Sequence, residues 1–329
     1  MDKRDLICIG TSAGGVEALM RIASSLPANL PAAVAVVLHL APDHHSALPR
    51  ILSNAGPLQA VHPKDREPLT PGRIYVAPPD HHMLVEPGHL RLVRGARENS
   101  HRPAVDPMFR TAAYNYGARA VGAILTGALD DGTGGLLAIK QRGGTTIVQD
   151  PEDAFCPDMP RSALEYVKPD HIAKLADIGP LLSRLAGGKV ENGKQSSSVL
   201  EEEAKAELES PIHPHPPPGS PSPFSCPACG GVLNEVHDGG MVRFRCRVGH
   251  GYTPETALVE QRVTVEGALW AALRALEEQA DLATRMGTRA RRQGNLHSAV
   301  RFEERGEAAT KQADVLRRLL AVEAGPQVA

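Results

Sequence analysis

Apolar residues fall in short, uninterrupted runs through the first half of the chain, and segments with helical spacing follow them. Continuous apolar runs of this length predict strands that are buried on both faces. Strands that alternate with helices predict an α/β fold, with a mainly parallel, doubly wound sheet flanked by helices and ending near residue 185. The predicted strands cover residues 6–10, 33–40, 120–126 and 145–148, and the predicted helices cover 14–25, 132–141 and 159–167.

A separate hairpin is predicted in the chain between the second and third of these strands. Residues 83–86 and 90–93 flank Pro87, Gly88 and His89, which have the residue types of a turn. With this hairpin, we expect residues 1–186 to form one domain.

The alternation stops at residue 187. Residues 187–224 contain three successive serines, the acidic run Glu201–Glu203 and a Pro-rich end. Such a segment has too few apolar residues to form a core, and its proline residues favour an extended chain. We expect a disordered Pro/Ser/Glu-rich linker over residues 187–224.

The chain becomes strongly helical after a compact Cys/His segment, residues 225–253. Two helices over residues 257–286 and 297–324 predict an antiparallel hairpin within residues 254–329. The pattern is typical of a helix that packs on its neighbour, but it also fits a docking or self-association surface, and the sequence does not decide between them. The apolar positions at helical spacing are Val263, Ala268, Leu269, Ala272, Leu273 and Leu276.

Composition narrows the classes of partner. A net charge of -2 gives no attraction to nucleic acid or to an anionic membrane, and an aromatic content of 3% gives few residues on which bases could stack. The N-terminal apolar run is too short for a signal peptide or a spanning helix, and no later segment is long enough. We expect a cytoplasmic protein without membrane insertion and without a nucleic-acid partner.

A candidate nucleophile lies between the first strand and the first helix. Residues 10–15 read Gly-Thr-Ser-Ala-Gly-Gly and satisfy G-x-S-x-G, in which small residues permit a tight turn that exposes the Ser12 hydroxyl. The N-terminus of the following helix offers backbone N–H groups to an oxyanion. The same glycine-rich turn also fits a phosphate-binding turn of a dinucleotide fold, or a simple tight turn.

His39 favours a serine esterase site at this turn over a dinucleotide-binding site. A dinucleotide site requires an acidic residue at the end of the second strand, where this chain has His39. A histidine at this position can also be an ordinary core residue. Because ligands bind at the carboxyl ends of parallel strands, His39 is placed to act as a general base for Ser12.

The end of the third strand supplies a carboxylate. Asp130 and Asp131 follow residues 124–129, directly before Gly132 and a predicted helix. An aspartate here can cap the helix, or it can orient His39 and stabilise its protonated form. Spacing alone does not choose between Asp130 and Asp131.

Together these motifs resemble the protein-glutamate methylesterases of bacterial chemotaxis. The resemblance covers residues 5–185 and rests on five segments in one order, residues 10–15, 39–42, 101–106, 124–132 and 159–161. It implies a methylesterase catalytic domain with Ser12 as nucleophile, His39 as base and Asp131 as the orienting acid, and no cofactor for catalysis. It also implies hydrolysis of glutamyl methyl esters, and deamidation of certain glutamines, on a methylated chemoreceptor-like helical protein.

Two departures from the family pattern are visible. The usual members begin with a phospho-receiver domain, whereas the catalytic domain here begins near residue 5, and we expect no control by phosphorylation within the chain. Beside the site, Ala13 stands where the family usually has Ser or Thr, and Ala128 stands where it usually has Met. The backbone N–H of Ala13 is still expected to donate to an oxyanion.

The Cys/His segment predicts a structural zinc site. Cys226 and Cys229 form a CxxC, and Cys246 and His250 form a C-x-x-x-H, on either side of a two-stranded ribbon with its turn at residues 237–240. Four such ligands suit tetrahedral zinc and leave no open position for catalysis. A reduced, metal-free hairpin is the alternative. The pairs His44–His45 and His81–His82 lack partners with metal-ligand spacing.

Two function classes follow from the sequence. The first is an ester hydrolase with an acyl-enzyme intermediate, which the complete set of Ser12, His39 and Asp131 favours. The second is a regulatory module that uses the esterase fold, the ribbon and the helices for partner binding. His101 and Arg102 are candidates for substrate contacts, although a solvated loop explains them equally well.

Overall fold

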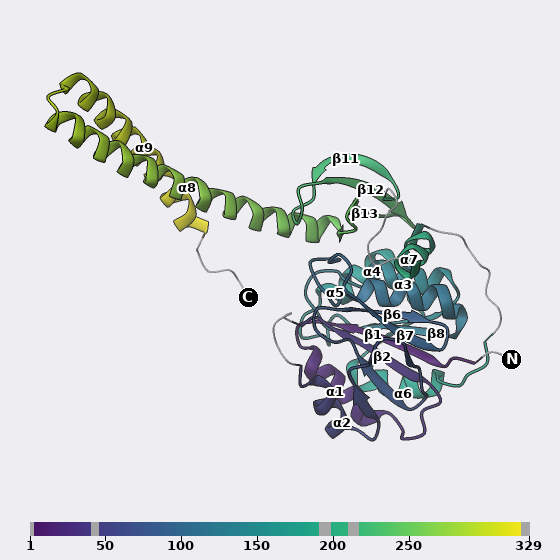
Figure 1. The fold of residues 1–329 in the computed structure, drawn as a ribbon. Helices are drawn as coiled ribbons and strands as arrows, with labels where there is room; N and C mark the ends of the chain where they lie inside the picture. The colour runs from purple at the N-terminus through teal and green to yellow at the C-terminus, as the bar shows by residue number, and fades with distance from the viewer. Residues whose placement is uncertain (1–2, 41–45, 191–198, 210–216, 324–329) are drawn as a thin grey trace. The chain divides into compact units, whose positions relative to one another are not determined.

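A computed structural model of the chain describes residues 3–40, 46–190, 199–209 and 217–323 (Figure 1). Two compact units are present, Met1–Ala257 and Leu258–Ala329. Residues 191–198 and 210–216 of the predicted linker, and the pair His44–His45, lie outside the described residues.

Seven parallel strands form the central sheet of the first unit, in the order β10-β9-β8-β1-β2-β5-β3. Every residue of β1, β2, β8 and β9 is buried, as their continuous apolar runs predicted, and the α/β fold class is confirmed. The seven strands are β1 (Leu6–Thr11), β2 (Ala33–Leu38), β3 (Gln59–Val61), β5 (Arg73–Val76), β8 (Ala120–Ile124), β9 (Thr145–Gln149) and β10 (His171–Ala173).

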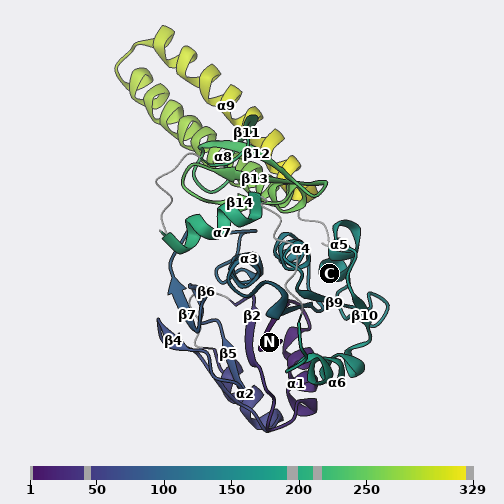
Figure 2. The same ribbon diagram turned by 90° about the vertical axis from the view of Figure 1, so that its right-hand side faces the viewer.

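Helices cover both faces of this sheet (Figures 1 and 2). Alternate side chains of β1 divide between two cores: Ile7 packs with α1, α2 and α6, and Cys8 packs with α3, α4 and α5. A short 3₁₀ turn, Gly117–Arg119, leads from α3 into β8. The helices are α1 (Gly15–Ser25), α2 (Leu48–Ala55), α3 (Val105–Tyr116), α4 (Thr133–Gln141), α5 (Asp158–Tyr166) and α6 (Leu175–Leu185).

The predicted hairpin is confirmed as part of a small antiparallel sheet. Strands β6 (His82–Glu86) and β7 (His89–Val93) pair across the turn at Gly88, and β4 (Glu67–Pro68) pairs with β7. Val85 of β6 shares the core with α3. The chain leaves β7 and enters the loop that precedes α3.

The predicted linker is wrong in part, because two of its segments are ordered. Helix α7 (Val199–Glu209) buries Leu200 and Ala204, and strand β11 (Ser220–Ser225) pairs with the ribbon. The acidic side chains of α7 are not all solvated: Glu203 and Glu207 are buried against arginines. These partners lie far away in the sequence, so the composition of residues 187–224 could not indicate them.

The Cys/His segment forms the ribbon, a four-stranded antiparallel sheet in the order β11-β12-β13-β14. The predicted turn is present, since β12 (Val232–Asp238) and β13 (Met241–Cys246) join through Gly239 and Gly240, both with positive φ. Strand β14 (Gly251–Tyr252) completes the sheet. The ribbon belongs to the same compact unit as the seven-stranded sheet.

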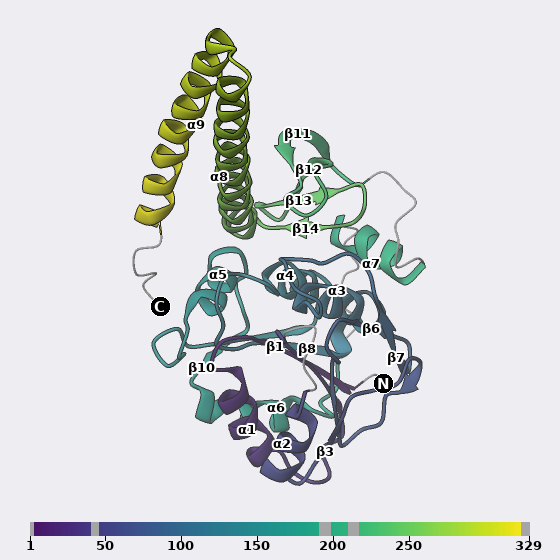
Figure 3. The same ribbon diagram turned by 60° about the vertical axis from the view of Figure 1, so that its left-hand side comes forward.

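The second unit is an antiparallel pair of helices (Figure 3). Helix α8 (Pro254–Arg292) begins in the first unit and continues into the second, where α9 (Leu296–Glu323) follows. Leu273 packs with Ala313 and Leu320, whereas Val263, predicted on the same stripe, is exposed, as are Ala268 and Ala272. Among the described residues, we find no helix with the length and apolar character needed to cross a membrane.

Candidate active site

Ser12 lies in the turn that joins β1 to α1. Gly14 has φ of +76°, a left-handed conformation that favours glycine, and caps the start of the helix. Gly127, from the turn after β8, lies so close that a Cβ on it would be 2.9 Å from the Ser12 Cβ. Only small residues on both turns allow this approach. Ser12 itself is partly exposed.

The structure brings the three predicted residues together. His39 follows β2 directly, and Asp131 follows the turn after β8, so both lie at the same edge of the sheet as Ser12. The His39 Nδ1 is 3.1 Å from the Ser12 Oγ, and the His39 Nε2 is 2.7 Å from the Asp131 Oδ2. This edge lies beside β1, where the strand order reverses and ligands bind in doubly wound folds.

The two ring nitrogens of His39 have different partners. For Nδ1 to accept a proton from the Ser12 hydroxyl, the neutral ring must carry its hydrogen on Nε2. The Asp131 carboxylate is placed to accept that hydrogen, which selects this tautomer. The order of the two nitrogens is the reverse of that in chymotrypsin, where Nε2 faces the serine.

Asp131 is buried but is held as a carboxylate by several donors. Its Oδ2 also accepts the Val105 N–H at 2.6 Å, and its Oδ1 accepts the Asn99 Nδ2 at 2.9 Å. Burial raises the pKa of Asp131, but hydrogen bonds from His39, Val105 and Asn99 outweigh it, and the net pKa lies below its usual value. Its negative charge is therefore available to a protonated His39.

The neighbouring Asp130 has a different environment. Its Oδ1 accepts a hydrogen bond from the Thr256 Oγ1 at 2.9 Å, at the start of α8. Burial raises the pKa of Asp130 to about 7. Of the two aspartates that spacing could not separate, only Asp131 contacts His39.

His101 and Arg102, the predicted substrate contacts, are part of the scaffold. The His101 ring stacks on the His39 ring with 3.6 Å between centroids and 12° between planes. The guanidinium of Arg102 pairs with Asp80 at 2.5 Å and donates to the Gly95 carbonyl. Arg102 is thus engaged within the protein, and His101 contacts the candidate base.

Asn99 is a site residue that the sequence analysis missed. It is 2% exposed, and its amide donates to both Asp131 and Asp106. A signal was available, since Asn99 lies two residues before the motif at His101, but an asparagine in a loop has many ordinary roles.

Backbone N–H groups near Ser12 are candidates for binding an oxyanion. The Ser12 N–H donates to the Thr126 carbonyl at 3.0 Å and is therefore engaged. Within the described ranges, no hydrogen-bond acceptor is found for the Ala13 N–H, which precedes α1. The Ala13 N–H is thus positioned where a helix N-terminus favours negative charge.

The four predicted metal ligands also converge. Ligand atoms of Cys226, Cys229, Cys246 and His250 lie within 4.8 Å of one another. The Sγ atoms of Cys229 and Cys246 are 3.8 Å apart, and the Cys226 Sγ and His250 Nδ1 are 3.7 Å apart. Zinc–sulfur bonds of about 2.3 Å in a tetrahedron require ligand separations of about 3.8 Å, so the donor set fits zinc.

His81 and His82 do not form a metal pair. His82 is buried and its Nε2 lies 2.9 Å from the Ala96 carbonyl, while His81 Nδ1 lies 3.0 Å from the Pro79 carbonyl. Across the residues that the structure describes, the Cys226 cluster alone gathers three or more potential ligands.

Comparison with known proteins places this site in a family. Residues 7–182, more than half of the chain, match the family described as CheB methylesterase. The chain belongs to the CheB methylesterase family. The CheB methylesterase catalytic domain of Thermotoga maritima is similar over its whole length, with 32% identity and a TM-score of 0.54, and it covers 56% of this chain.

The match to this chain covers different shares of the length of its relatives in the CheB methylesterase family. A Leptospira interrogans protein is 36% identical over 188 residues, which are 57% of this chain and 97% of that protein. Proteins of Moorella thermoacetica and Pseudomonas aeruginosa are 38% and 37% identical over 56% and 55% of this chain, but the match covers only 45% and 53% of their lengths. Both are named protein-glutamate methylesterase/protein-glutamine glutaminase.

Proposed function

We propose that the chain hydrolyses glutamyl methyl esters on proteins and also deamidates protein glutamines. The observation that carries the proposal is the continuous hydrogen-bonded series Ser12–His39–Asp131 in a CheB methylesterase domain. The names of the relatives supply the two reactions. Both reactions have the same acyl chemistry, since each begins with attack on the side-chain carbonyl of a glutamyl group.

The first half of the proposed reaction forms an acyl-enzyme. The Ser12 Oγ attacks the ester carbonyl carbon while His39 Nδ1 takes the hydroxyl proton. The Ala13 N–H donates to the oxygen that becomes negative, and Asp131 stabilises the protonated ring of His39. The carbon–oxygen bond to the methoxy group then breaks, and His39 returns its proton so that methanol leaves.

The second half releases the product. A water molecule gives a proton to His39 and attacks the acyl carbon, and the bond to Ser12 Oγ breaks as His39 protonates it. The product is a glutamic acid side chain, which releases its proton to the solvent and becomes a carboxylate, and the enzyme returns to its starting state. With glutamine as substrate, ammonia leaves in place of methanol.

The proposed substrate is a methylated, chemoreceptor-like helical protein in the cytoplasm. Ser12 lies in a short turn at the rim of a sheet and is partly exposed. Such a position admits a side chain that is displayed on the surface of a folded helix.

We also propose that one structural zinc ion binds Cys226, Cys229, Cys246 and His250. Four protein ligands complete a tetrahedron, so this ion would supply folding free energy to the ribbon rather than catalysis. The proposed esterase reaction needs no metal.

Covalent labelling tests the proposed nucleophile. We expect a fluorophosphonate to modify Ser12, and mass spectrometry of the peptide identifies the modified residue. The modification should be lost in Ser12→Ala. It should be retained in a control, Ser24→Ala, because Ser24 is an exposed residue of α1. Absence of modification at Ser12 in the native chain would support the alternative, a regulatory module that keeps the fold without the esterase reaction.

A further inference from the structure

The loop of residues 97–101, between β7 and α3, contacts two of the three proposed catalytic residues. Asn99 donates to the Asp131 Oδ1 at 2.9 Å, and His101 stacks on the His39 ring. The backbone of the loop is unusual, because Asn99 and Ser100 have φ of +48° and +66°. Two successive non-glycine residues in the left-handed region need contacts on both sides to hold them there.

The ribbon supplies contacts on the other side of this loop. The Asn99 N–H donates to the Gly251 carbonyl at 2.9 Å, and the Gly251 N–H donates to the Arg97 carbonyl at 3.3 Å. The Thr253 N–H donates to the Asn99 Oδ1 at 3.3 Å. One amide side chain, that of Asn99, therefore joins the segment after the metal ligand His250 to the carboxylate that orients His39.

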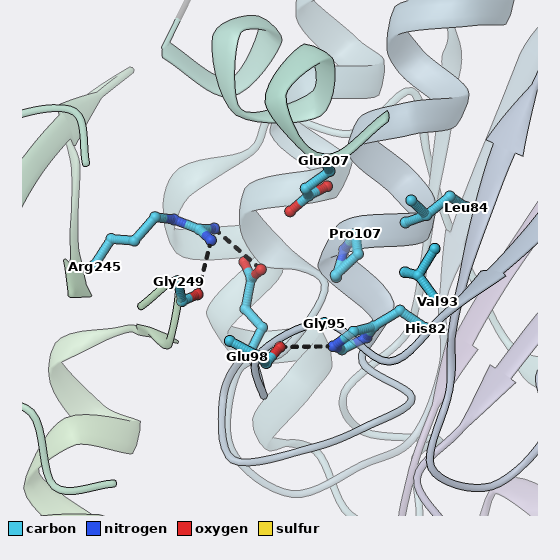
Figure 4. A pocket seen from close by; sticks show the side chains of 10 residues that line it. His82, Leu84, Val93, Gly95, Glu98, Pro107, Glu207, Arg245 and Gly249 are labelled. Carbon is cyan, nitrogen blue, oxygen red and sulfur yellow. Dashed lines mark hydrogen bonds and ion pairs between the residues drawn. The ribbon is translucent and has the colours of Figure 1, made fainter. Parts of the chain in front are cut away.

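A buried cluster of charges fixes the ribbon in this position. We call it the Arg–Glu cluster: Arg110, Glu98, Glu203, Glu207, Arg243 and Arg245. Glu98 lies next to Asn99 in the loop. Its carboxylate accepts hydrogen bonds from Arg110 of α3 at 2.5 and 2.7 Å and from Arg245 of β13 at 3.0 Å. Figure 4 shows Arg245 reaching from the ribbon to Glu98 and to the Gly249 carbonyl.

Glu203 and Glu207 of α7 complete the Arg–Glu cluster. Glu203 bonds both ribbon arginines, at 2.8 Å to Arg243 and 3.1 Å to Arg245, and Glu207 pairs with Arg110. Removal of one partner leaves the others charged in a buried site, so the cluster holds the ribbon, α7 and the loop as one arrangement.

A second contact reaches the same turn of the active site. The Thr256 Oγ1 donates to Asp130 at 2.9 Å, and Asp130 adjoins Asp131 in the chain. The Thr253 Oγ1 accepts the Thr256 N–H at 3.1 Å and shapes this segment. Residues 251–256 thus contact the active site through Asn99 and through Asp130.

We propose that the ribbon is a positioning element of the active site: docked on the Arg–Glu cluster, it holds residues 97–101 so that Asn99 orients Asp131 and His101 packs on His39. This inference rests on the proposed function of Ser12, His39 and Asp131. Because residues 97–101 face the base and its carboxylate, release of the ribbon lowers the rate of the chemical step and leaves the binding of a small ester largely unchanged.

Two variants of the full chain test the proposal. Arg245→Gln weakens the Arg–Glu cluster, and Asn99→Gly removes the amide while glycine keeps the left-handed backbone. Arg247→Gln, an exposed arginine of the same ribbon, is the matched control. The readouts are the rate of fluorophosphonate modification of Ser12, kcat and KM for a small methyl ester, and hydrogen–deuterium exchange of residues 97–101.

We expect Arg245→Gln and Asn99→Gly to lower the labelling rate and kcat at least tenfold with less than a threefold change in KM, and Arg247→Gln to match the native chain. Exchange at residues 97–101 should become faster in Arg245→Gln. Native labelling rates in an Arg245→Gln protein whose loop exchanges faster would overturn the proposal. Should Arg245→Gln fail to fold, Asn99→Gly decides, and native kcat in that variant would also overturn it.

The outcomes separate this proposal from the proposed function. If Ser12 of the native chain is not labelled, the esterase assignment fails. The positional claim is then decided by exchange alone, and unchanged protection of residues 97–101 in Arg245→Gln would refute it.

Discussion

Ser12, His39 and Asp131 lie together because three parallel strands end side by side. The register places Gly10 opposite Val37 on one neighbour and Ile124 on the other, so the turns that follow meet at one edge. Each side chain then needs only a short turn to reach the next. The proposed chemistry thus follows from strand order more than from any single motif.

We predict that Ser12→Ala and His39→Ala each lower ester turnover by on the order of 10³-fold or more, and that the double variant is no worse than either single variant. The two residues act in one proton transfer, so loss of either one removes the contribution of the other to the rate. Steady-state kinetics of the three variants with a small methyl ester is the measurement. Additive losses would show that the two residues act independently.

The buried carboxyl of Asp106 should make stability depend on pH. Burial and the nearby charge of Asp131 raise the pKa of Asp106 to about 8, so the folded protein keeps a proton that the unfolded chain releases near pH 4. This stabilisation is complete below about pH 4 and is lost as pH rises through 8.

We therefore predict that Asp106→Asn reduces the fall in the free energy of unfolding between pH 5 and pH 8, by on the order of a few kcal/mol. Urea titrations of both proteins at the two pH values measure it. An equal fall in the native and variant proteins would mean that Asp106 is ionised in the folded state.

At the residue scale, the sequence predicted the site residues that lie at strand ends and missed Asn99, the site residue that lies in a loop. Ser12, His39 and Asp131 follow buried strands, whose position the apolar runs indicate. Asn99 depends on the path of residues 97–101, which hydrogen bonds to Gly251 and Thr253 determine. Those partners are more than 150 positions away, beyond any local pattern.

At the scale of elements, α7 illustrates how tertiary contacts override composition. Residues 199–209 contain five glutamates, and composition alone predicts a solvated segment. Three arginines buried in α3 and β13 provide charges that two of these glutamates neutralise, and burial of Leu200 and Ala204 adds apolar contacts. The regular strands and α1, by contrast, follow their apolar periodicity closely.

We predict that Glu203→Gln destabilises the first unit by about 3–5 kcal/mol, because it leaves Arg243 and Arg245 charged in a buried site. The surrounding arginines lower the pKa of Glu203 to about 2, although burial opposes this shift, so the charge is present at neutral pH. Glu202→Gln, an exposed neighbour on the same helix, is the control. Equal free energies of unfolding for the two variants would contradict a structural role for the cluster.

The ribbon is expected to contain one zinc ion per chain. Cys226→Ser should lower the zinc content, measured by atomic absorption of purified protein, and should speed hydrogen exchange in β12 and β13, because metal binding supplies folding free energy. A ribbon with native protection and no bound metal would show that its apolar core is sufficient.

At the scale of the whole molecule, the chain divides after Ala257 rather than after the predicted catalytic domain. The ribbon and α7 pack within the first unit, and the helical hairpin forms the second. The sequence predicted the hairpin from its helical spacing. It could not predict that the ribbon packs with the catalytic sheet, since the Arg–Glu cluster joins residues that lie 12 to 147 positions apart.

We predict that the helical hairpin recruits protein substrates. A partner bound to the second unit would be present at a high effective concentration near the first. Truncation after Ala257, which keeps the whole first unit, should therefore lower turnover of a methylated receptor fragment more than turnover of a small methyl ester. Equal losses on both substrates would exclude a recruiting role.

Methanol release tests the central claim most directly. The full chain is incubated with a receptor fragment whose glutamates carry methyl esters, and methanol is measured over time beside Ser12→Ala. The account predicts steady methanol release by the native chain, a matching gain of free glutamate in the fragment, and no release above background by Ser12→Ala. Equal release by the two proteins would contradict the account, and so would no release by the native chain.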